Sequence, residues 1–506
     1  MLPGLAPRLA AAVALQLVER DRAYLTKALD DAWRPFPTPS HDDRAFSTEL
    51  ALGTCRWRGI LDAALDPLLP RGLESLDDIT RQILRLAAYE LLGPHPTPPH
   101  AAVHLAVEAA KQLRNPSLSR LVNGVLRSLT RSSQLVAGRS QSTTRSPRPS
   151  SPTTLRHEES PPDPSGAPKP TTRPDRPTND QQLLSALPPW LFSAFSSAWG
   201  EPAALALSRW SLDRPTRSLR LNRRHPDFPS HLRTNDSTGR NRTAPFRARL
   251  GQPRAEARGS DTEVRPPGDS LITNNSPVLP LPPGAGDLRS HHLVASGAAT
   301  PQEHGAYLVA EALPLRSGAI VLDACAGRGT KTTALAERLP PDATLLAADV
   351  NPDKLARLAP ELQRLGLPPV ETLAVDWSVG VAGIAGSFDA ILVDAPCSGT
   401  GTLSRRPEIR WRLDPSDIDR LAALQSAILR RTASLLAPGG MLLYAVCSLL
   451  PAEGPEQMRS LLSSSPGLLP VPGAFPLPWH PLDIGAALLP HESGTDGFYA
   501  ALLRRP

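Results

Sequence analysis

The chain has 506 residues, of which 40% are hydrophobic, and this length allows two to four domains with more than one sizeable core. Its formal charge of +6 favours a polyanionic partner, although an arginine-rich composition without a binding role would give the same excess. No apolar run approaches the roughly eighteen residues of a membrane span, so we expect no membrane association. The four cysteines form no cluster with metal-ligand spacing, so we expect no metal, and unpaired cysteines fit a reducing cytoplasm.

Residues 1–132 are expected to form a domain of helices, because apolar residues recur there at spacings of three and four. Four arginines on these helices could contact phosphates, or could equally be solvated helix residues. They are Arg56, Arg58, Arg85 and Arg127. The helical segments are 10–29, 46–65, 79–92, 101–113 and 118–129.

Two polar stretches divide the rest of the chain. Residues 133–180 are rich in Ser, Pro, Thr and Arg and are expected to form a disordered linker. Residues 181–224, with a helical pattern to about Trp210 and a strand near 218–222, predict a small subdomain. Residues 225–270 are again polar and Arg-rich, which predicts a low-complexity insertion, with an arm that grips RNA as the alternative.

Residues 271–506 predict an α/β domain that could bind a nucleotide. A strand ending at Asp323 leads into a turn with Gly327 and Gly329, whose glycines let the backbone approach a ligand at a helix N-terminus. Asp349 follows the next strand, about twenty residues further, where such a unit places a carboxylate for the two ribose hydroxyls. Asp376 follows the third strand and could meet an adenine amino group. The alternative is that these acids only cap helices.

Two further apolar, strand-like runs stop at a cysteine. One ends in Asp394 and is followed by Cys397, and the other is followed by Cys447. If both strands end at the ligand-binding edge of the sheet, an acid and two thiols come together there. Because a thiolate is a strong nucleophile, the pattern predicts covalent chemistry, although a small buried hydrophobe is the commoner role of a single cysteine. Cys55 and Cys325 are expected to be packing residues.

These runs carry a family resemblance. Asp394-Ala-Pro-Cys-Ser-Gly-Thr-Gly401, Val446-Cys-Ser448 and Thr495-Asp-Gly-Phe-Tyr-Ala500 resemble motifs of the RNA (cytosine-C5) methyltransferases that use S-adenosylmethionine, specifically the RsmB/Sun type acting on 16S ribosomal RNA. Two departures stand out. The family's cofactor loop usually reads Cys-Ala-Ala-Pro-Gly-Gly-Lys, whereas this one reads Cys325-Ala-Gly-Arg-Gly-Thr-Lys331, and the family's Thr-Cys-Ser has Val446 in place of Thr.

The N-terminal region carries a second resemblance. Glu49–Trp57, Arg85–Leu91 and Leu121–Arg127 resemble the RNA-binding domain of the antitermination factor NusB, which RsmB-type enzymes carry at their N-terminus. The resemblance therefore implies a multidomain chain. An all-α NusB-like RNA-binding domain (1–132) would precede an α/β Rossmann-like class I S-adenosylmethionine-dependent methyltransferase domain (271–506).

The resemblance also implies roles for the site residues. Cys447 would attack C6 of the base, Cys397 would assist release of the methylated product, and Asp394 would hydrogen-bond the base near N3. The cofactor S-adenosylmethionine would contact the loop and the strand-end acids. These residues are Cys325, Ala326, Gly327, Arg328, Gly329, Thr330, Lys331, Asp349, Asp376 and Asp394.

The implied reaction is methylation of 16S rRNA, at the family's site, cytosine 967, by a cytoplasmic enzyme expected to be monomeric. The first alternative is the same chemistry on tRNA or another RNA. The second is a non-catalytic NusB-type RNA-binding factor, against which the presence of both Cys397 and Cys447 argues, because a binding module needs neither thiol.

Overall fold

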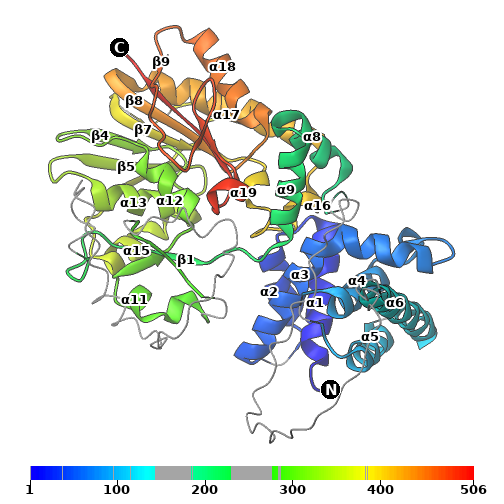
Figure 1. The fold of residues 1–506 in the computed structure, drawn as a ribbon. Helices are drawn as coiled ribbons and strands as arrows, with labels where there is room; N and C mark the ends of the chain where they lie inside the picture. The colour runs from blue at the N-terminus through cyan, green and yellow to red at the C-terminus, as the bar shows by residue number, and fades with distance from the viewer. Residues whose placement is uncertain are drawn as a thin grey trace, which may run out of the picture. The chain divides into compact units, whose positions relative to one another are not determined.

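The computed structural model divides the chain into two compact units, residues 1–189 and 190–506, which we describe separately (Figure 1). Among the described residues, no helix is long and apolar enough to cross a membrane. The structure describes residues 2–36, 38–94, 96–113, 116–142, 184, 186–229, 276–282, 286–381, 383–384 and 386–506. Most of the expected linker, from residue 143 to 180, and the expected insertion from residue 230 onward lie outside these ranges.

The first unit is built from helices, as the apolar spacing predicts. They are α1 (Leu5–Asp21), α2 (Leu25–Trp33), α3 (His41–Leu65), α4 (Asp78–Leu92), α5 (Pro99–Leu113) and α6 (Pro116–Ser142), with short 3-10 turns η1 (Asp66–Leu68) and η2 (Leu73–Ser75). Side-chain caps start two of them: Ser40 accepts from the backbone N–H of Asp43, and Asp77 from that of Thr80. Helix α4 is buried from Ile79 to Glu90 and packs against α1, α3, α5 and α6, so the core surrounds it.

One expectation for this unit is wrong. Residues 10–29 were expected to form one helix, but α1 ends at Asp21 and α2 begins at Leu25. Arg22 has a left-handed φ of 51°, which an α-helix cannot accommodate. Apolar residues continue at helical spacing on both sides of the break, with Leu25, Ala28 and Leu29 buried in α2, so periodicity alone does not reveal it.

The second unit begins with α8 (Pro189–Trp199) and α9 (Glu201–Leu212), which lead into a three-stranded antiparallel sheet. In this sheet β1 (Ser218–Leu221), from the expected small subdomain, pairs with β2 (Val278–Pro280) and β3 (Ala299–Pro301), which lie beyond the expected boundary at residue 271. The small subdomain is therefore assembled from both sides of residues 230–275.

The larger sheet has nine strands, in the order β10-β11-β12-β8-β7-β4-β5-β6, with β9 paired to β12. Strands β4 to β8 are parallel where they pair, and β12 is antiparallel to β8. In the sheet, β5 and β6 lie on one side of β4, and β7 and β8 lie on its other side. The strand order therefore reverses between β4 and β7. Ligands of open α/β sheets bind at such a point. The strands are β4 (Ile320–Asp323), β5 (Thr344–Asp349), β6 (Glu371–Ala374), β7 (Phe388–Asp394), β8 (Leu436–Val446), β9 (Leu469–Pro470), β10 (His480–Pro481), β11 (Ala486–Leu488) and β12 (Phe498–Arg504).

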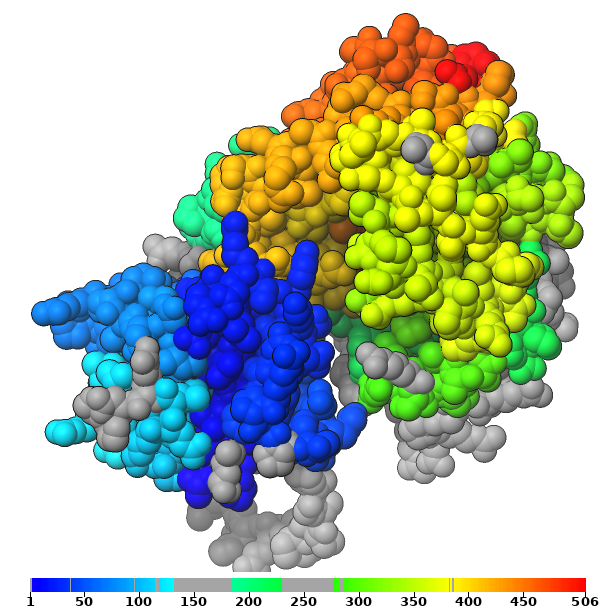
Figure 2. Space-filling model, turned by 180° about the vertical axis from the view of Figure 1, so that it is seen from behind, coloured from blue at the N-terminus to red at the C-terminus, as the bar shows by residue number. Residues whose placement is uncertain are grey.

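Helices cover both faces of this sheet (Figure 1). On one face α12 (His304–Glu311), α13 (Thr330–Arg338) and α15 (Leu358–Leu365) pack on strand residues such as Ala390 and Leu392. On the other, α17 (Pro415–Ser434) and α18 (Pro455–Ser464) pack on Ile391 and Val393. From Ala390 to Val393, strand β7 is therefore buried on both faces, as the apolar run there predicts. Figure 2 shows this unit hollowed between the yellow segment that includes β6 and the orange segment that includes α17. The shorter helices and turns are η4 (Leu288–Ser290), α11 (His292–Ala295), α14 (Pro352–Leu355), η5 (Thr400–Thr402), α16 (Ile409–Arg412), η6 (Pro451–Glu453) and α19 (Pro490–Ser493).

Candidate active site

The two candidate thiols meet at the carboxyl ends of β7 and β8. The Sγ atoms of Cys397 and Cys447 lie 3.3 Å apart, within hydrogen-bonding distance for sulfur, and both cysteines are free. Cys397 follows β7 by three residues, and Cys447 directly follows β8, which pairs with β7 in parallel. The sequence places each cysteine at a strand end, and the sheet brings the two strand ends side by side.

The surroundings of the two thiols favour a negative charge on Cys447. Its pKa is lowered, first because Cys397 donates a hydrogen bond to it, and also because Lys331 and Arg406 carry positive charge nearby. The pKa of Cys397 is raised well above its ordinary value, because a charged Cys397 would lose this bond and because it is buried. These opposite shifts of pKa favour a Cys397 thiol beside a Cys447 thiolate, and only the thiolate is a strong nucleophile.

An ion pair links the loop after β4 to the acid at the end of β7. The Nζ of Lys331 donates to Oδ2 of Asp394 over 2.6 Å, and Lys331 Nζ lies 5.3 Å from the centre of the Phe498 ring. Burial acts to lower the pKa of Lys331, but Asp394 outweighs it and the net shift is upward. Lys331, the last residue of the candidate cofactor loop, therefore stays charged close to Cys447.

The loop after β4 is shaped to hold a ligand. Both carboxylate oxygens of Asp349 are held by the backbone, since Oδ2 accepts from Gly327 N and Oδ1 from Asn351 N, each over 2.9 Å. Gly327 and Gly329 have left-handed φ values of 57° and 87°, and a Cβ on Gly327 would meet nothing within 4 Å. Open space beside a fixed carboxylate suits a ribose with two hydroxyls, so these residues fit the cofactor that the motifs imply.

The other members of the loop differ in exposure. Arg328 and Thr330 are exposed, Ala326 is buried, and Gly329 precedes the first turn of α13. Burial raises the pKa of Cys325 well above its ordinary value, which makes it a poor nucleophile and agrees with a packing role. Asp323 is fully buried below the loop, where burial raises its pKa to about 7 although Thr332 donates a 2.7 Å hydrogen bond to it.

Asp376 lies just after β6, at the same edge of the sheet as Asp349. Its side chain is exposed, and its Oδ1 accepts from the N–H and the hydroxyl of Ser378 over 2.8 and 2.6 Å. The carboxylate is therefore engaged in a local turn through Oδ1. A contact with adenine stays a prediction.

Sequence reasoning missed a buried carboxylate, Glu453, in η6. Its Oε1 accepts from the backbone N–H of Ser398 over 2.8 Å, and its Oε2 accepts from the hydroxyls of Ser398 and of Ser448, the latter over 2.6 Å. Ser398 follows Cys397 and Ser448 follows Cys447, so one fully buried side chain holds both cysteine loops. Gln425 of α17 donates a further 3.0 Å hydrogen bond to Oε1. The only signal in the sequence is an acid six residues after Cys447, in an otherwise apolar stretch.

A third loop, before β12, closes against the two cysteine loops. The backbone N–H of Gly401 donates to Cys447 O over 3.0 Å, and Gly497 N donates to Gly401 O over 2.7 Å. Next to Gly497, the Asp496 carboxylate accepts a 2.8 Å hydrogen bond from Arg405 Nε. All three motifs that carry the family resemblance in this unit therefore meet at one place.

Three arginines that follow Cys397, namely Arg405, Arg406 and Arg410, differ in how far they are exposed. Arg410 is fully buried and donates to Ser211 O, Ser211 Oγ and Leu403 O, and Arg405 is paired with Asp496. Arg406 is exposed and contributes to the lowered pKa of Cys447. Within the described part of the chain, no group of three or more His, Cys, Asp or Glu side chains is placed to hold a metal ion.

Comparisons with known proteins identify the family of the chain. A family model described as 16S rRNA methyltransferase RsmB/F matches residues 310–504, and the NusB family model matches residues 5–131. Ribosomal RNA small subunit methyltransferase B of Pseudomonas putida is 30% identical over 503 residues, covering 98% of both chains. The protein of the same name from Cronobacter sakazakii is 30% identical over 477 residues, covering 92% of both. The crystal structure of PH0851 has the same fold, with a TM-score of 0.68 over 99% of both chains at 22% identity.

The sheet order, the loop after β4 and these matches define a class I methyltransferase with an N-terminal NusB domain. The chain belongs to the RsmB/F family of 16S rRNA methyltransferases, whose cofactor is S-adenosylmethionine. The expected fold class and the family resemblance are thereby confirmed.

Proposed function

We propose that this protein methylates C5 of a cytosine in 16S ribosomal RNA. The observation that carries the proposal is the pair of thiols, Cys397 and Cys447, 3.3 Å apart beside the ion pair of Lys331 with Asp394. Methylation of an amino nitrogen needs no thiol. C5 of cytosine, by contrast, is a poor nucleophile that gains carbanion character only when a nucleophile adds at C6.

In the proposed reaction the Cys447 thiolate adds to C6, forming a carbon–sulfur bond and placing electron density on C5. Asp394, held by Lys331, hydrogen-bonds the base near N3 and favours its protonation. S-adenosylmethionine, when bound, supplies the electrophilic methyl group that C5 accepts. A base then takes the C5 proton, the electrons of the C5–H bond restore the C5–C6 double bond, and Cys447 leaves as thiolate. Cys397 assists this release from its place beside the Cys447 sulfur.

We assign the cofactor to the loop 325–331 and to the strand-end acids, with Asp349 on the ribose hydroxyls. Its two fixed oxygens support this role. Asp349→Ala should weaken S-adenosylmethionine binding in calorimetry by about 1.5–3 kcal/mol for each charge-assisted hydrogen bond lost. Asp349→Asn, which keeps one acceptor, should lose less. Unchanged affinity in Asp349→Ala would remove this residue from the cofactor site.

The choice of 16S rRNA over tRNA rests on the NusB domain and on the relatives that share it over nearly their whole length. The presence of both thiols opposes a non-catalytic RNA-binding factor. Cytosine 967 as the target, a monomeric state and a cytoplasmic location stay predictions. Bisulphite sequencing of rRNA from cells with and without the gene would identify the base.

The sharpest test of the chemistry separates the two thiols. In the Cys397→Ala variant, Cys447 should still add to C6, and C5 should still accept the methyl group. The enzyme should then stall with methylated RNA covalently attached. A denaturing gel after incubation with RNA and S-adenosylmethionine should then show an RNA–protein band.

Cys447→Ala, and the double variant, should give no band and no methyl transfer. A band with Cys447→Ala and none with Cys397→Ala would reverse the two roles. Methyl transfer by Cys447→Ala close to the rate of the unaltered enzyme would overturn the covalent mechanism.

A further inference from the structure

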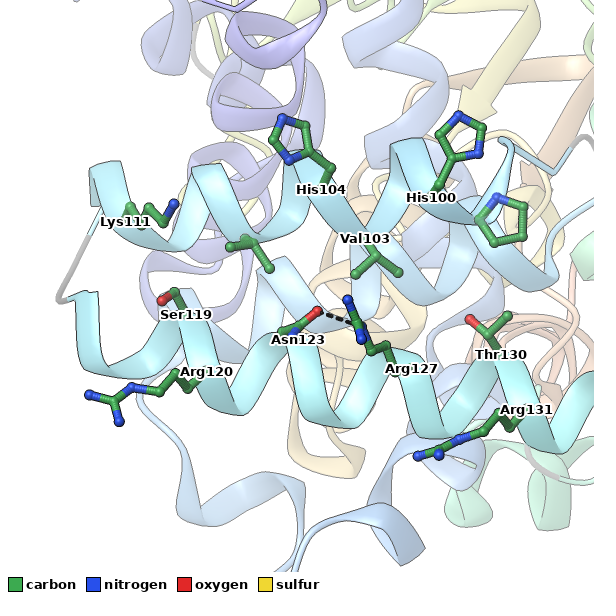
Figure 3. A pocket seen from close by; sticks show the side chains of 12 residues that line it. His100, Val103, His104, Lys111, Ser119, Arg120, Asn123, Arg127, Thr130 and Arg131 are labelled. Carbon is green, nitrogen blue, oxygen red and sulfur yellow. Dashed lines mark hydrogen bonds between the residues drawn. The ribbon is translucent and has the colours of Figure 1, made fainter.

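A cationic groove lies on the first unit, between α5 and α6, and the roles proposed so far do not use it (Figure 3). It encloses about 760 Å³. Val103 and Val107 of α5 contribute half-buried apolar side chains. His100, His104 and Lys111 line it from α5, and Arg120, Arg127 and Arg131 line it from α6.

The basic side chains follow one stripe along each helix. Arg120, Arg127 and Arg131 are spaced by seven and four residues, which puts them on one face of α6, and all three are exposed. At 1.5 Å per residue, their Cα atoms extend over about 16 Å of the helix. His100, His104 and Lys111 are spaced by four and seven residues, which likewise puts them on one face of α5. The groove therefore presents positive charge over a length that suits a chain of phosphates rather than one small anion.

The arginines of the groove differ from the other arginines that the sequence singles out. Arg85 is fully buried and donates to both oxygens of Asp62, over 2.7 and 2.9 Å, and to Glu19 over 3.1 Å. Arg58 pairs with the same Glu19 over 2.8 Å, and Arg56 is buried. Arg56 and Arg85 are therefore closed to phosphates, and Arg58, whose side chain is 20% exposed, is already paired with an acid. Arg127 alone among the four expected candidates is exposed.

Two of the three groove arginines donate to neutral groups of the same helix. Arg127 Nε donates to Asn123 Oδ1 over 3.1 Å, and Arg131 donates to the Ser128 hydroxyl over 3.3 Å. No Asp or Glu is present among the described residues that line the groove, and the pair of Lys111 with Glu108 lies at its edge. A bound anion would therefore not have to compete with acids of the lining itself.

We propose that this groove binds a single-stranded segment of the substrate RNA that does not include the base that is methylated. The guanidinium groups of α6 contact successive phosphates, and the two imidazole rings and the valines of α5 accept bases and sugars. The proposal rests on the proposed function only for the identity of the RNA. An anionic backbone matches the charge of the groove, whereas a second copy of this chain, with a formal charge of +6, does not.

The test compares two variants of the full chain that lose the same charge. R120Q/R127Q/R131Q changes the groove, and R20Q/R34Q/R44Q changes three exposed arginines that are paired with acids elsewhere on the unit. Binding to a 16S rRNA fragment that spans the target is measured by fluorescence anisotropy over a range of salt concentrations. The melting temperature of each variant shows whether it is folded.

The groove variant should bind at least tenfold more weakly and should lower the slope of log affinity against log salt by about 2, since each lost phosphate contact with a single strand contributes about 0.7. The control variant should change both quantities much less. Equal losses of RNA affinity in the two variants would overturn the proposal. Unchanged affinity in both variants would also overturn it, and is the result expected if a protein occupies the groove. Because the readout is binding, a protein that binds RNA through the groove but transfers no methyl group would contradict the proposed function and leave this inference standing.

Discussion

At the scale of single residues, the site depends on an unequal pair of cysteines. Hydrogen bonding from Cys397 and the nearby positive charges favour the thiolate of Cys447, while Cys397 stays protonated. The same chemical group therefore takes two roles because the environments differ, as in other sites that use paired titratable groups.

This asymmetry predicts the pH dependence of Cys447 alkylation. The folded-state pKa of Cys447 is lowered, so its thiolate, and hence its rate with iodoacetamide, should reach a plateau at lower pH than that of an ordinary cysteine. Cys397→Ala removes the hydrogen-bond donor and should move the profile to higher pH. Cys397→Ser keeps a donor and should move it less. Peptide mass spectrometry assigns the label to Cys447, and identical profiles in all three proteins would contradict the assignment.

Glu453 is expected to matter through position, not through contact with RNA. Glu453→Gln keeps the size of the side chain but replaces one accepting oxygen with a donor that faces Ser398 or Ser448. A mismatched buried group costs about 1–3 kcal/mol, so the melting temperature should fall and methyl transfer should drop at least tenfold at a temperature where the variant is folded. The Cys447 alkylation profile should also move, because the two loops no longer hold the sulfurs together.

The matched control for this variant is Glu456→Gln, on the exposed surface of the adjoining helix α18. It should leave stability and activity nearly unchanged. If Glu453→Gln loses stability while the alkylation profile and the rate stay as they were, Glu453 is a structural residue only.

Whether a site residue could be predicted from the sequence depends on how far apart along the chain the residues that it contacts lie. Cys397, Cys447 and Asp349 could be placed from the sequence because Asp349 ends a strand with a clear apolar pattern and the two cysteines follow such strands, and strand ends converge in a parallel sheet. The Lys331 pairing with Asp394 and the Glu453 contacts join separate loops, so no periodicity encodes them. For the same reason, sequence did not separate the buried Arg85 from the exposed Arg127.

At the scale of elements, the loops after β7 and β8 and before β12 approach one another so closely that only glycine fits. A Cβ on Gly401 would lie far inside van der Waals contact with the carbonyl oxygen of Gly497, which is backbone and cannot rotate away. Gly401→Ala should therefore destabilise the second unit by about 1–3 kcal/mol, the usual cost of overpacking. Urea unfolding measures the loss.

The control at this scale is Gly467→Ala, because an added Cβ at Gly467 meets nothing within 4 Å. It should change the free energy of unfolding little. Equal stability of the two variants would mean that the three loops separate easily, which would contradict a rigid placement of Cys447 by its backbone bond with Gly401.

At the scale of the whole molecule, each unit has a hydrophobic core of its own. The helices of residues 1–189 surround α4, and the strands of residues 190–506 are covered on both faces. Sequence patterns predict this division because the helical spacing and the strand-like runs occupy different parts of the chain. They do not predict that β1 pairs with β2 and β3 across residues 230–275, because strand pairing is not local.

Separate cores predict that a cofactor analogue stabilises one unit and not the other. S-adenosylhomocysteine at about 100 times its dissociation constant stabilises the state that binds it by about 2.7 kcal/mol. Amide hydrogen exchange in β4, β5 and the loop 325–331 should slow, up to about 100-fold where exchange requires the whole unit to unfold. Exchange in α4, the core helix of the first unit, should stay the same.

Asp349→Ala should abolish the protection at the same analogue concentration, which separates binding at this site from a general effect of the analogue. Slowed exchange in α4 would show that the two cores open as one cooperative unit.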